Sequence, residues 1–420
     1  MAQGFSDRAL FKRRQIIRGA GGFGAALLLA KVAGCTTTTD SGAAPSEAEE
    51  TTAETSDEPI KLGLVAAITG PSAVSGESIT RGLTVAMEEI NANGGVNARP
   101  LELVIRDDES TPAKGVAAAR ELIEKEKVAL VFGGLDSPVS LAMLPVFHEL
   151  ETPYMGVWAA ATGITRNGND PNYAFRVSAN DNIVDSYLLR YAKNELGATK
   201  VGLVLINNPW GESNQVGFEE WAPKYDMEIV DIEKFNDGDT DISPQLGRLQ
   251  DGGAETLLMV ANAAPSAVAM KSLIRLGWDV PVVSHWGPTG GRFPELAGQE
   301  AADRVVFMQT YSFFDDQSEL GESVMGKLQE KYDVSGPQDI IAPVGTANAY
   351  DAMNLVALAL ETAPSLDGPA LRESFYDLPA YEGLIKTYEQ PFSPENHDAL
   401  NEDDYILVQW QDNQLVPFKG

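Results

Sequence analysis

The sequence predicts an α/β protein whose folded part consists of two doubly wound parallel-sheet lobes. From residue 60 onward, apolar runs of strand length alternate with amphipathic stretches of helical length, which predicts parallel sheets with helices on both faces. This alternation occurs in two series, and the second begins after Asp181. The roughly 360 residues that follow position 58 also exceed the size at which one hydrophobic core usually stops growing, which favours two lobes.

Each element is assigned from its own apolar pattern. In the first series, we expect strands and helices in turn at 60–68, 77–93, 101–106, 112–125, 128–132, 138–150 and 154–157. In the second series, helices and strands alternate at 182–196, 200–206, 213–224, 228–235, 243–250, 256–260, 265–276 and 281–284. Ligands of such sheets bind in the loops beyond the carboxyl ends of the strands, so those loops are the candidate site.

Residues 1–34 have the layout of an export signal peptide. A basic stretch at 12–18 precedes a short apolar run that is too short to span a bilayer. Its adjacent arginines, followed by two isoleucines, resemble a twin-arginine signal. Residues 32–35 resemble a lipobox, in which Cys35 becomes the acylated N-terminus, although a buried helix with an incidental cysteine is the alternative. Cys35 is the only cysteine, so no internal disulfide is possible.

Residues 35–58 read as a disordered acidic tether. The segment is rich in Thr, Ser, Ala and Glu and has no aromatic residue, so it cannot bury enough surface to offset the entropy lost on ordering. We expect a flexible spacer between a membrane and the folded part. A glycine pattern at 19–24 matches the dinucleotide-binding fingerprint, but no strand precedes it, and we reject that reading.

The chain is strongly acidic, with 31 Lys and Arg against 61 Asp and Glu and a net charge of −30. Phosphate binding needs clustered basic residues, so nucleic acid is not an expected partner, and neither is an anionic lipid surface. High negative charge keeps a protein soluble and monomeric, and we expect a monomer.

Two loops of the first series carry groups that suit a ligand. Ser137 and Pro138 follow a strand and open a helix, with Ser137 placed as the N-cap. The amino end of that helix suits a carboxylate, although a cap with no further role fits equally well. In the next loop, Trp158 and Ala160 stand among small residues that allow close approach, and Thr162 offers a hydroxyl. A tight structural loop would look similar.

Two tryptophans of the second series occupy equivalent loops, Trp210 after one strand and Trp286 after another. A tryptophan at a strand end is more often a packing residue. Two of them, with Trp158 expected opposite, favour an aromatic-lined cleft.

The sequence gives little sign of catalysis, and we expect neither an enzyme nor a cofactor. It has three histidines and lacks the nucleophile elbow, the P-loop and the zinc-protease motif. The acids at 237–241 resemble a calcium loop, but Ile242 and Arg248 stand where glycine and glutamate are required, so we expect a solvated turn and no metal. A pair of catalytic carboxylates stays open in so acidic a chain.

Several motifs together resemble the type I periplasmic-binding proteins of ABC transporters, of the branched-chain amino acid receptor kind. The similarity covers residues 59–420 and is carried by segments 68–71, 88–96, 106–108, 173–177, 238–241 and 349–352. It implies three crossover segments between the lobes, near Asn180, Thr310 and Lys386. Lobe 1 would then comprise 59–180 plus 311–386, and lobe 2 would comprise 181–310 plus 387–420.

The resemblance also implies ligand contacts. They map onto Ser75, Ser137, Ala160, Thr162, Asp181, Trp210 and Trp286. Trp286 departs from the family pattern, because amino acid receptors commonly place an acid there to pair with the ligand's ammonium. The aromatics that such receptors carry near Asn262 are also missing, and Asp136 or Asp181 would have to supply the negative charge. A small carboxylate, aromatic or hydrophobic, is therefore preferred, with an amino acid or amide next.

These inferences predict an extracytoplasmic receptor that is anchored by Cys35 to the cytoplasmic membrane. It would capture a small molecule between its lobes and deliver it to an ABC permease and ATPase complex. A ligand-sensing module of the same fold is the alternative, although no signalling domain follows it in the sequence. An enzyme of two-lobed α/β architecture is the third possibility and would turn its ligand over.

Overall fold

The computed structural model describes residues 58–419, which form two parallel-sheet assemblies and a small two-stranded sheet. The predicted signal peptide, Cys35 and nearly all of the tether lie outside the described residues. Across 58–419 there is no helix with the length and apolar character needed to cross a membrane.

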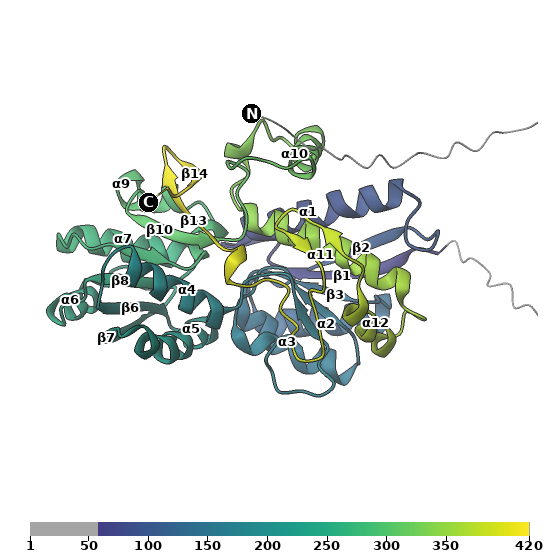
Figure 1. Ribbon diagram of the computed structural model, residues 1–420, viewed down its shortest axis with the longest axis horizontal. Coiled ribbons are helices and arrows are strands. Elements are labelled where there is room, and N and C mark those ends of the chain that lie inside the picture. The colour runs from purple at the N-terminus through teal and green to yellow at the C-terminus, as the bar shows by residue number, and fades with distance from the viewer. Residues whose placement is uncertain (1–57, 420) are drawn as a thin grey trace, which may run out of the picture. The chain divides into compact units, whose positions relative to one another are not determined.

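The first sheet has five parallel strands in the order β2-β1-β3-β4-β5. Its strands are β1 (Ile60–Ala66), β2 (Leu101–Asp107), β3 (Val131–Gly133), β4 (Tyr154–Gly156) and β5 (Ala174–Arg176). Its helices are α1 (Ala73–Ala92), α2 (Pro112–Glu121), α3 (Ser137–Glu149), α11 (Pro343–Thr362) and α12 (Gly368–Ser374). The pairs α1·α11 and α2·α3 cover opposite faces of the sheet (Figure 1).

The second sheet has the order β14-β13-β10-β9-β8-β6-β7, so its parallel strands repeat the arrangement of the first. They are β6 (Lys200–Ile206), β7 (Glu228–Phe235), β8 (Thr256–Val260), β9 (Val282–Ser284) and β10 (Val305–Gln309). The C-terminal hairpin of β13 (Ile406–Gln411) and β14 (Gln414–Pro417) adds two antiparallel strands at the edge. Asp412 and Asn413 turn this hairpin in the left-handed region, which short polar residues tolerate.

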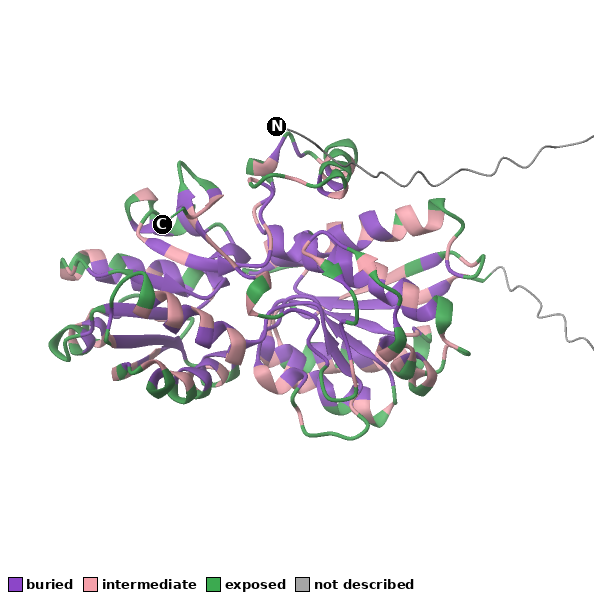
Figure 2. Ribbon diagram, viewed as in Figure 1, coloured by how far each residue is buried: buried purple, intermediate pink, exposed green. Residues whose placement is uncertain are grey.

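Helices cover both faces of the second sheet, with α4 packed against α5 and α6 against α7 (Figure 1). Their bounds are α4 (Asp181–Asn194), α5 (Pro209–Trp221), α6 (Ser243–Asp251) and α7 (Ala263–Leu276). The remaining elements are α8 (Phe293–Ala297), α9 (Gln299–Ala302), α10 (Glu319–Lys331), β11 (Tyr381–Glu382) and β12 (Thr387–Tyr388). The central strands of both sheets are buried, the edge strands β2, β7 and β14 are partly exposed, and the helices expose their outer faces (Figure 2).

Close approach between α1 and α11 depends on Gly82. A Cβ atom at this position would lie 2.2 Å from the carbonyl oxygen of Thr346, which no side chain could accommodate without moving the backbone. α11 is reached only after the chain has passed through the second sheet, so the first sheet is completed by residues far along the sequence.

The C-terminal segment before β13 is tied to the first sheet by a buried ion pair. Asp398 forms a parallel bridge with Arg176 of β5. Its Oδ1 atom accepts hydrogen bonds from Nε (2.8 Å) and Nη2 (2.7 Å) of Arg176, and both side chains are almost fully buried. Burial alone would raise the pKa of Asp398, but the charge and hydrogen bonds of Arg176 outweigh it and the pKa is lowered.

The predicted fold class is confirmed, and every strand and helix predicted between 60 and 284 is present. Strands β6, β7 and β8 have the predicted bounds at both ends. Helix α5 starts four residues earlier than predicted because Asn208 accepts hydrogen bonds from the backbone N–H groups of Trp210 and Gly211 and so caps it. Strand β5 and all elements beyond residue 284, β10 among them, had not been predicted.

We expect Asp398→Ala to destabilise the protein by about 3–5 kcal/mol, because it leaves the buried guanidinium of Arg176 without its counter-charge. Chemical denaturation of the full chain measures the loss. The matched control is Glu330→Ala on the exposed face of α10, which should change the free energy of unfolding by no more than about 0.5 kcal/mol. Equal stability of the two variants would contradict this role of the ion pair.

Candidate functional site

Loops from both sheets meet at the carboxyl ends of their strands and enclose a small cavity of about 10 Å³. The loops follow β3 and β4 of the first sheet and β6, β8 and β9 of the second. The strand order reverses between β1 and β3, and again between β6 and β8, which is where doubly wound sheets bind ligands. The walls are formed by Leu135, Asp136, Ser137, Pro138, Trp158, Ala160, Asn208, Trp210, Asn262 and Trp286.

Seven of the ten predicted ligand-binding residues therefore lie together around this cavity. They are Asp136, Ser137, Trp158, Ala160, Trp210, Asn262 and Trp286. The other three, Ser75, Thr162 and Asp181, are not among the lining residues. Their polar atoms instead hold the surrounding loops in place.

Ser137 occupies the first turn of α3. The helix begins at Ser137 with Asp136 in the cap position, so the prediction that Ser137 is the N-cap is wrong by one residue. The reason is that the Ser137 hydroxyl turns away from its own helix and accepts a hydrogen bond from the backbone N–H of Ala161, at 3.2 Å. Its hydroxyl hydrogen is left available to an acceptor in the cavity.

Two tryptophans from different sheets contact each other across the site. The rings of Trp158 and Trp286 lie edge to face, with centroids 6.2 Å apart and an interplanar angle of 67°. Both side chains are almost fully buried, with 1% and 2% of their surface exposed. The indole N–H of Trp158 has no hydrogen-bond partner among the described residues. Because the cavity has room for roughly one water molecule, a larger ligand can enter only if its walls move.

Asp181 fixes the third tryptophan from behind the cavity wall. Its Oδ1 atom accepts hydrogen bonds from Nε1 of Trp210 and from Nε2 of His285, each at 3.1 Å. The Nδ1 atom of His285 accepts the backbone N–H of Trp286 at 2.8 Å, which places the ring hydrogen on Nε2. With both nitrogens engaged, His285 has no free position from which to act as a base.

Ser75 and Thr162 have their hydroxyls committed to neighbouring backbone and side chains. The Oγ atom of Ser75 donates to the carbonyl of Ser72 at 2.6 Å. The Oγ1 atom of Thr162 donates to Oδ1 of Asn180 and accepts from the backbone N–H of Asn182, each at 3.0 Å. Thr162 thus joins its loop to the start of α4, where Asn180 is the N-cap.

The lining of the site is acidic and has no basic group. It holds the carboxyl of Asp136 and no Lys, Arg or His side chain. Asp136 accepts one hydrogen bond at Oδ1, from Asn262 at 3.3 Å, whereas Oδ2 is buried without one. Burial raises the pKa of Asp136; the nearby side chains of Ser110 and Asn262 oppose the rise, and the charge of Asp237 adds to it.

Asp108, which directly follows β2, is a second buried acid and lies close enough to Asp136 for their charges to interact. Its side chain is 2% exposed. Burial raises its pKa to about 7, a bond from the backbone N–H of Ser110 opposes the rise, and the charges of Asp136 and Asp107 add to it. The carboxyls behind the site therefore ionise with difficulty in its present form.

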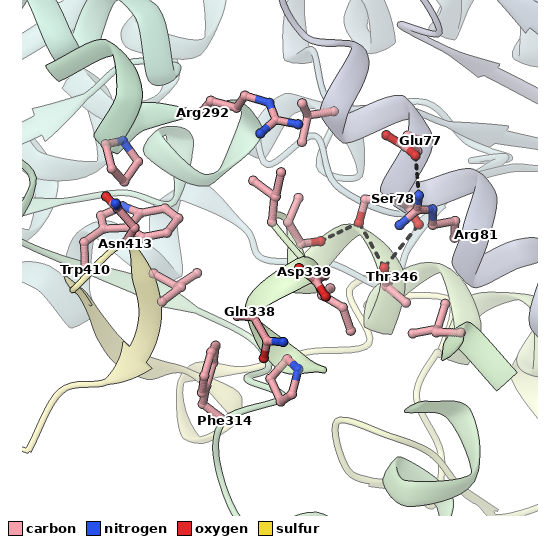
Figure 3. A pocket seen from close by; sticks show the side chains of 18 of the residues that line it. Glu77, Ser78, Arg81, Arg292, Phe314, Gln338, Asp339, Thr346, Trp410 and Asn413 are labelled. Atoms are coloured by element: carbon pink, nitrogen blue, oxygen red, sulfur yellow. Dashed lines mark hydrogen bonds and ion pairs between the residues drawn. The ribbon is translucent and has the colours of Figure 1, made fainter. Parts of the chain in front are cut away.

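A second and larger cavity, of about 390 Å³, is lined by α1, by residues that follow β9 and β10, and by the hairpin of β13 and β14. Arg81 and Thr346 stand on one side of it, and Trp410 and Asn413 on the other (Figure 3). Its basic groups are already paired, since Arg81 binds Glu77 and Arg292 binds Glu295. This cavity is larger than the first, but the first is lined by the loops directly after five strands of the two sheets, and we take the first as the candidate site.

Across the described residues 58–419, no group of three or more His, Cys, Asp or Glu side chains is arranged to hold a metal ion. The acids at 237–241 form a loop before α6 in which Asp241 accepts hydrogen bonds from Ser243, not a closed cage.

Comparison with known proteins supplies the family. A family model described as periplasmic binding protein matches residues 59–414, which is most of the chain. The chain belongs to the periplasmic binding protein family. Its architecture is that of the type I members, and solved solute-binding proteins of ABC transporters share this fold.

Individual relatives of this periplasmic binding protein are distant but match almost end to end. Leu/Ile/Val-binding protein homolog 3 of Brucella melitensis is 24% identical over 361 residues, covering 85% of this chain and 93% of the relative. The branched-chain amino acid transporter substrate binding protein LivJ of Streptococcus pneumoniae, solved with isoleucine, has a TM-score of 0.73 at 22% identity, covering 85% and 98%. An ABC transporter solute binding protein of R. palustris, solved with 4-hydroxybenzoate, has a TM-score of 0.72 at 21% identity, covering 86% and 96%.

Four residues at the site had not been selected from the sequence: Leu135, Pro138, Asn208 and His285. Asn208 had a visible signal, because an asparagine followed by Pro209 after a strand is typical of a helix N-cap. The role of His285 had none, since its partner Asp181 is 104 residues away in the sequence.

We expect the intrinsic tryptophan fluorescence of the protein to change on ligand binding, because entry separates Trp158 from Trp286. Trp286→Phe should remove most of the change. Trp278→Phe, just beyond the end of α7, is the matched control and should keep it. A solute that raises the melting temperature without any change in emission would place the binding site elsewhere.

We expect Asp108→Asn to stabilise the protein increasingly as pH rises. The pKa of Asp108 is about 7 in the folded protein and about 4 in the unfolded chain. Between these pH values the unfolded chain releases this proton more readily than the folded protein does, so the wild-type protein becomes less stable as pH rises. The variant has no proton to release. Thermal unfolding at pH 4.5 and pH 7.5 measures the difference, and an equal pH dependence in both proteins would contradict the raised pKa.

Proposed function

We propose that this protein is an extracytoplasmic receptor of an ABC importer that captures a small carboxylate or amino-acid-like ligand and delivers it to a permease. The observation that carries the proposal is the convergence of loops from both sheets on one cavity at their strand ends. A site with walls on two sheets is complete only when the sheets approach, so ligand binding and closure favour each other. Such a receptor needs no catalytic group, and we propose none.

The ligand class is supported by the chemistry at the start of α3. The solved structures with isoleucine and with 4-hydroxybenzoate both concern solutes that carry a carboxylate. Here the hydroxyl hydrogen of Ser137 is available in the first turn of a helix, whose amino end favours negative charge. The unpartnered indole N–H of Trp158 is a second donor at the same cavity.

The two sheets are proposed to be the cores of two lobes that move relative to each other. The first and second crossings are kept near Asn180 and Thr310. The third, expected near Lys386, is proposed to lie later, between Leu400 and Tyr405, because Asp398 still pairs with β5 whereas β13 belongs to the second sheet.

The anchor remains a proposal from sequence. Residues 1–34 would direct export, Cys35 would carry the lipid, and the segment up to 58 would act as the spacer. A receptor held in this way stays beside its permease, which suits capture at the outer side of a membrane.

The decisive experiment is native mass spectrometry of the purified full chain, followed by a thermal-shift screen of carboxylates, amino acids and amides. A bound solute at 100 times its Kd stabilises the folded protein by about 2.7 kcal/mol. We expect a co-purified or added solute to bind one per chain and to leave unchanged. Chemical conversion of the solute would instead support an enzyme.

We expect Ser137→Ala to weaken binding of a carboxylate ligand by about 10-fold or more, because a hydrogen bond to a charged group contributes roughly 1.5–3 kcal/mol. Thr162→Ala should also weaken it, through loss of the contacts that hold its loop against α4. Isothermal titration calorimetry gives the Kd. Ser335→Ala, on an exposed residue, is the control, and unchanged affinity in both site variants would exclude the carboxylate model.

A further inference from the structure

The chemistry of the cavity points beyond a simple carboxylate. We propose that it selects solutes whose positive charge sits on an alkylated, quaternary ammonium group, held among Trp158, Trp210 and Trp286 and faced by Asp136. The inference rests on the proposed receptor function and names its ligand class.

The first argument is the composition of the walls. Three of the ten lining residues are tryptophans, one is an acid, and none is basic. Aromatic side chains around an acidic group form the kind of cage that recognises quaternary ammonium ions, because the face of an indole ring attracts positive charge. An anionic ligand with no positive group would meet Asp136 with no basic side chain on the walls to offset it.

The second argument is the arrangement of the rings. Trp158 and Trp286 are inclined at 67°, so the two rings do not stack flat and their faces point in different directions. Trp210 is fixed by its hydrogen bond to Asp181, at 3.1 Å, and stands edge-on to His285 at 76°. Donation of the indole N–H to a carboxylate also increases the electron density of the ring, which strengthens its attraction for a cation.

The third argument is electrostatic. The Oδ2 atom of Asp136 is buried without a hydrogen bond, and Asp108 lies behind it with 2% of its surface exposed. Removing such carboxyls from water is costly unless a positive charge accompanies them. A ligand cation supplies that charge, whereas a second anion would interact unfavourably at short range in a poorly solvated cavity.

The walls discriminate between kinds of ammonium. A primary ammonium needs an acceptor for each of its three N–H groups. On these walls Asp136 offers an unpartnered oxygen, Oδ2, but the side-chain oxygen of Asn208 is already used, since it accepts from the backbone N–H groups of Trp210 and Gly211 at 2.9 and 3.2 Å. A quaternary ammonium needs no acceptor and offers methyl groups to the indole faces.

Access requires movement of the two sheets. The cavity of about 10 Å³ has room for roughly one water molecule. Trp158 belongs to the first sheet's loops and Trp286 to the second's, so separating the sheets widens the space between the rings. A zwitterion would then place its carboxylate at Ser137 and its quaternary ammonium among the tryptophans.

The test compares the affinities of two ligands that have nearly the same shape but differ in charge. The full chain is titrated calorimetrically with choline and with 3,3-dimethylbutanol, in which carbon replaces the charged nitrogen. We expect choline to bind about 30-fold more tightly, the effect of a desolvated cation over aromatic faces. Glycine betaine should bind more tightly than choline because its carboxylate also reaches Ser137. Equal affinity for choline and the alcohol, or binding of neither choline nor betaine, overturns the proposal.

Two variants test the groups themselves. Asp136→Asn keeps the shape of the side chain and should weaken choline at least 10-fold without changing affinity for the neutral alcohol. Asp251→Asn, on the exposed end of α6, is the matched control and should leave both unchanged. Thermal unfolding of each variant confirms that it is folded. An Asp136→Asn protein that is folded and binds choline as the wild type does contradicts the role of the acid.

The outcomes separate this inference from the receptor function. If benzoate or an amino acid binds and stabilises the protein while choline and betaine do not, the receptor stands and the quaternary ammonium class is wrong. If no solute of any class binds and none co-purifies, the cavity is not a receptor site, and both proposals fail.

Discussion

The carboxylate of Asp398 is the point at which the segments around the site are joined. Its Oδ1 atom takes hydrogen bonds from Arg176 and from the hydroxyl of Thr165, and its Oδ2 atom takes one from the side-chain amide of Asn180. Asn180 in turn caps α4 and holds Thr162. One buried acid from the end of the chain thus fixes the last strand of the first sheet, a loop beside the cavity and the helix that leads into the second sheet.

The charge of this acid contrasts with that of the acids at the cavity. Asp398 is compensated by a buried arginine, and its pKa is lowered. Asp136 and Asp108 have no such partner, and burial raises the pKa of each. Both kinds of carboxyl are removed from water, so the difference is whether the protein provides the counter-charge itself. Asp398 has such a counter-charge and stabilises the fold. Asp136 and Asp108 have none, so a ligand in the site can interact with them.

The sequence was sufficient for the fold class, and seven of the ten residues that it selected lie around the candidate cavity. Strands such as β6 and β8 are continuous apolar runs because parallel strands are buried on both faces, and their bounds could be read directly. Helix α11 is buried along nearly its whole length, so it lacks the polar face that marks a surface helix. Strand-end position located the loops at Asp136, Trp210 and Trp286. It could not show which side chains point into the cavity. The hydroxyl of Ser75, for example, donates a hydrogen bond to the carbonyl of Ser72 in its own loop.

The order of the chain through the two sheets has a consequence for how the protein forms. The first sheet lacks α11 and the partner of Arg176 until the chain has already passed through the second sheet. The second lacks its edge hairpin until β13 and β14, residues 406–417, have been made. Neither sheet can be completed before that segment is available, and pairings so distant in sequence form slowly. Until then, the apolar strands of both sheets have unpaired edges that are prone to aggregate.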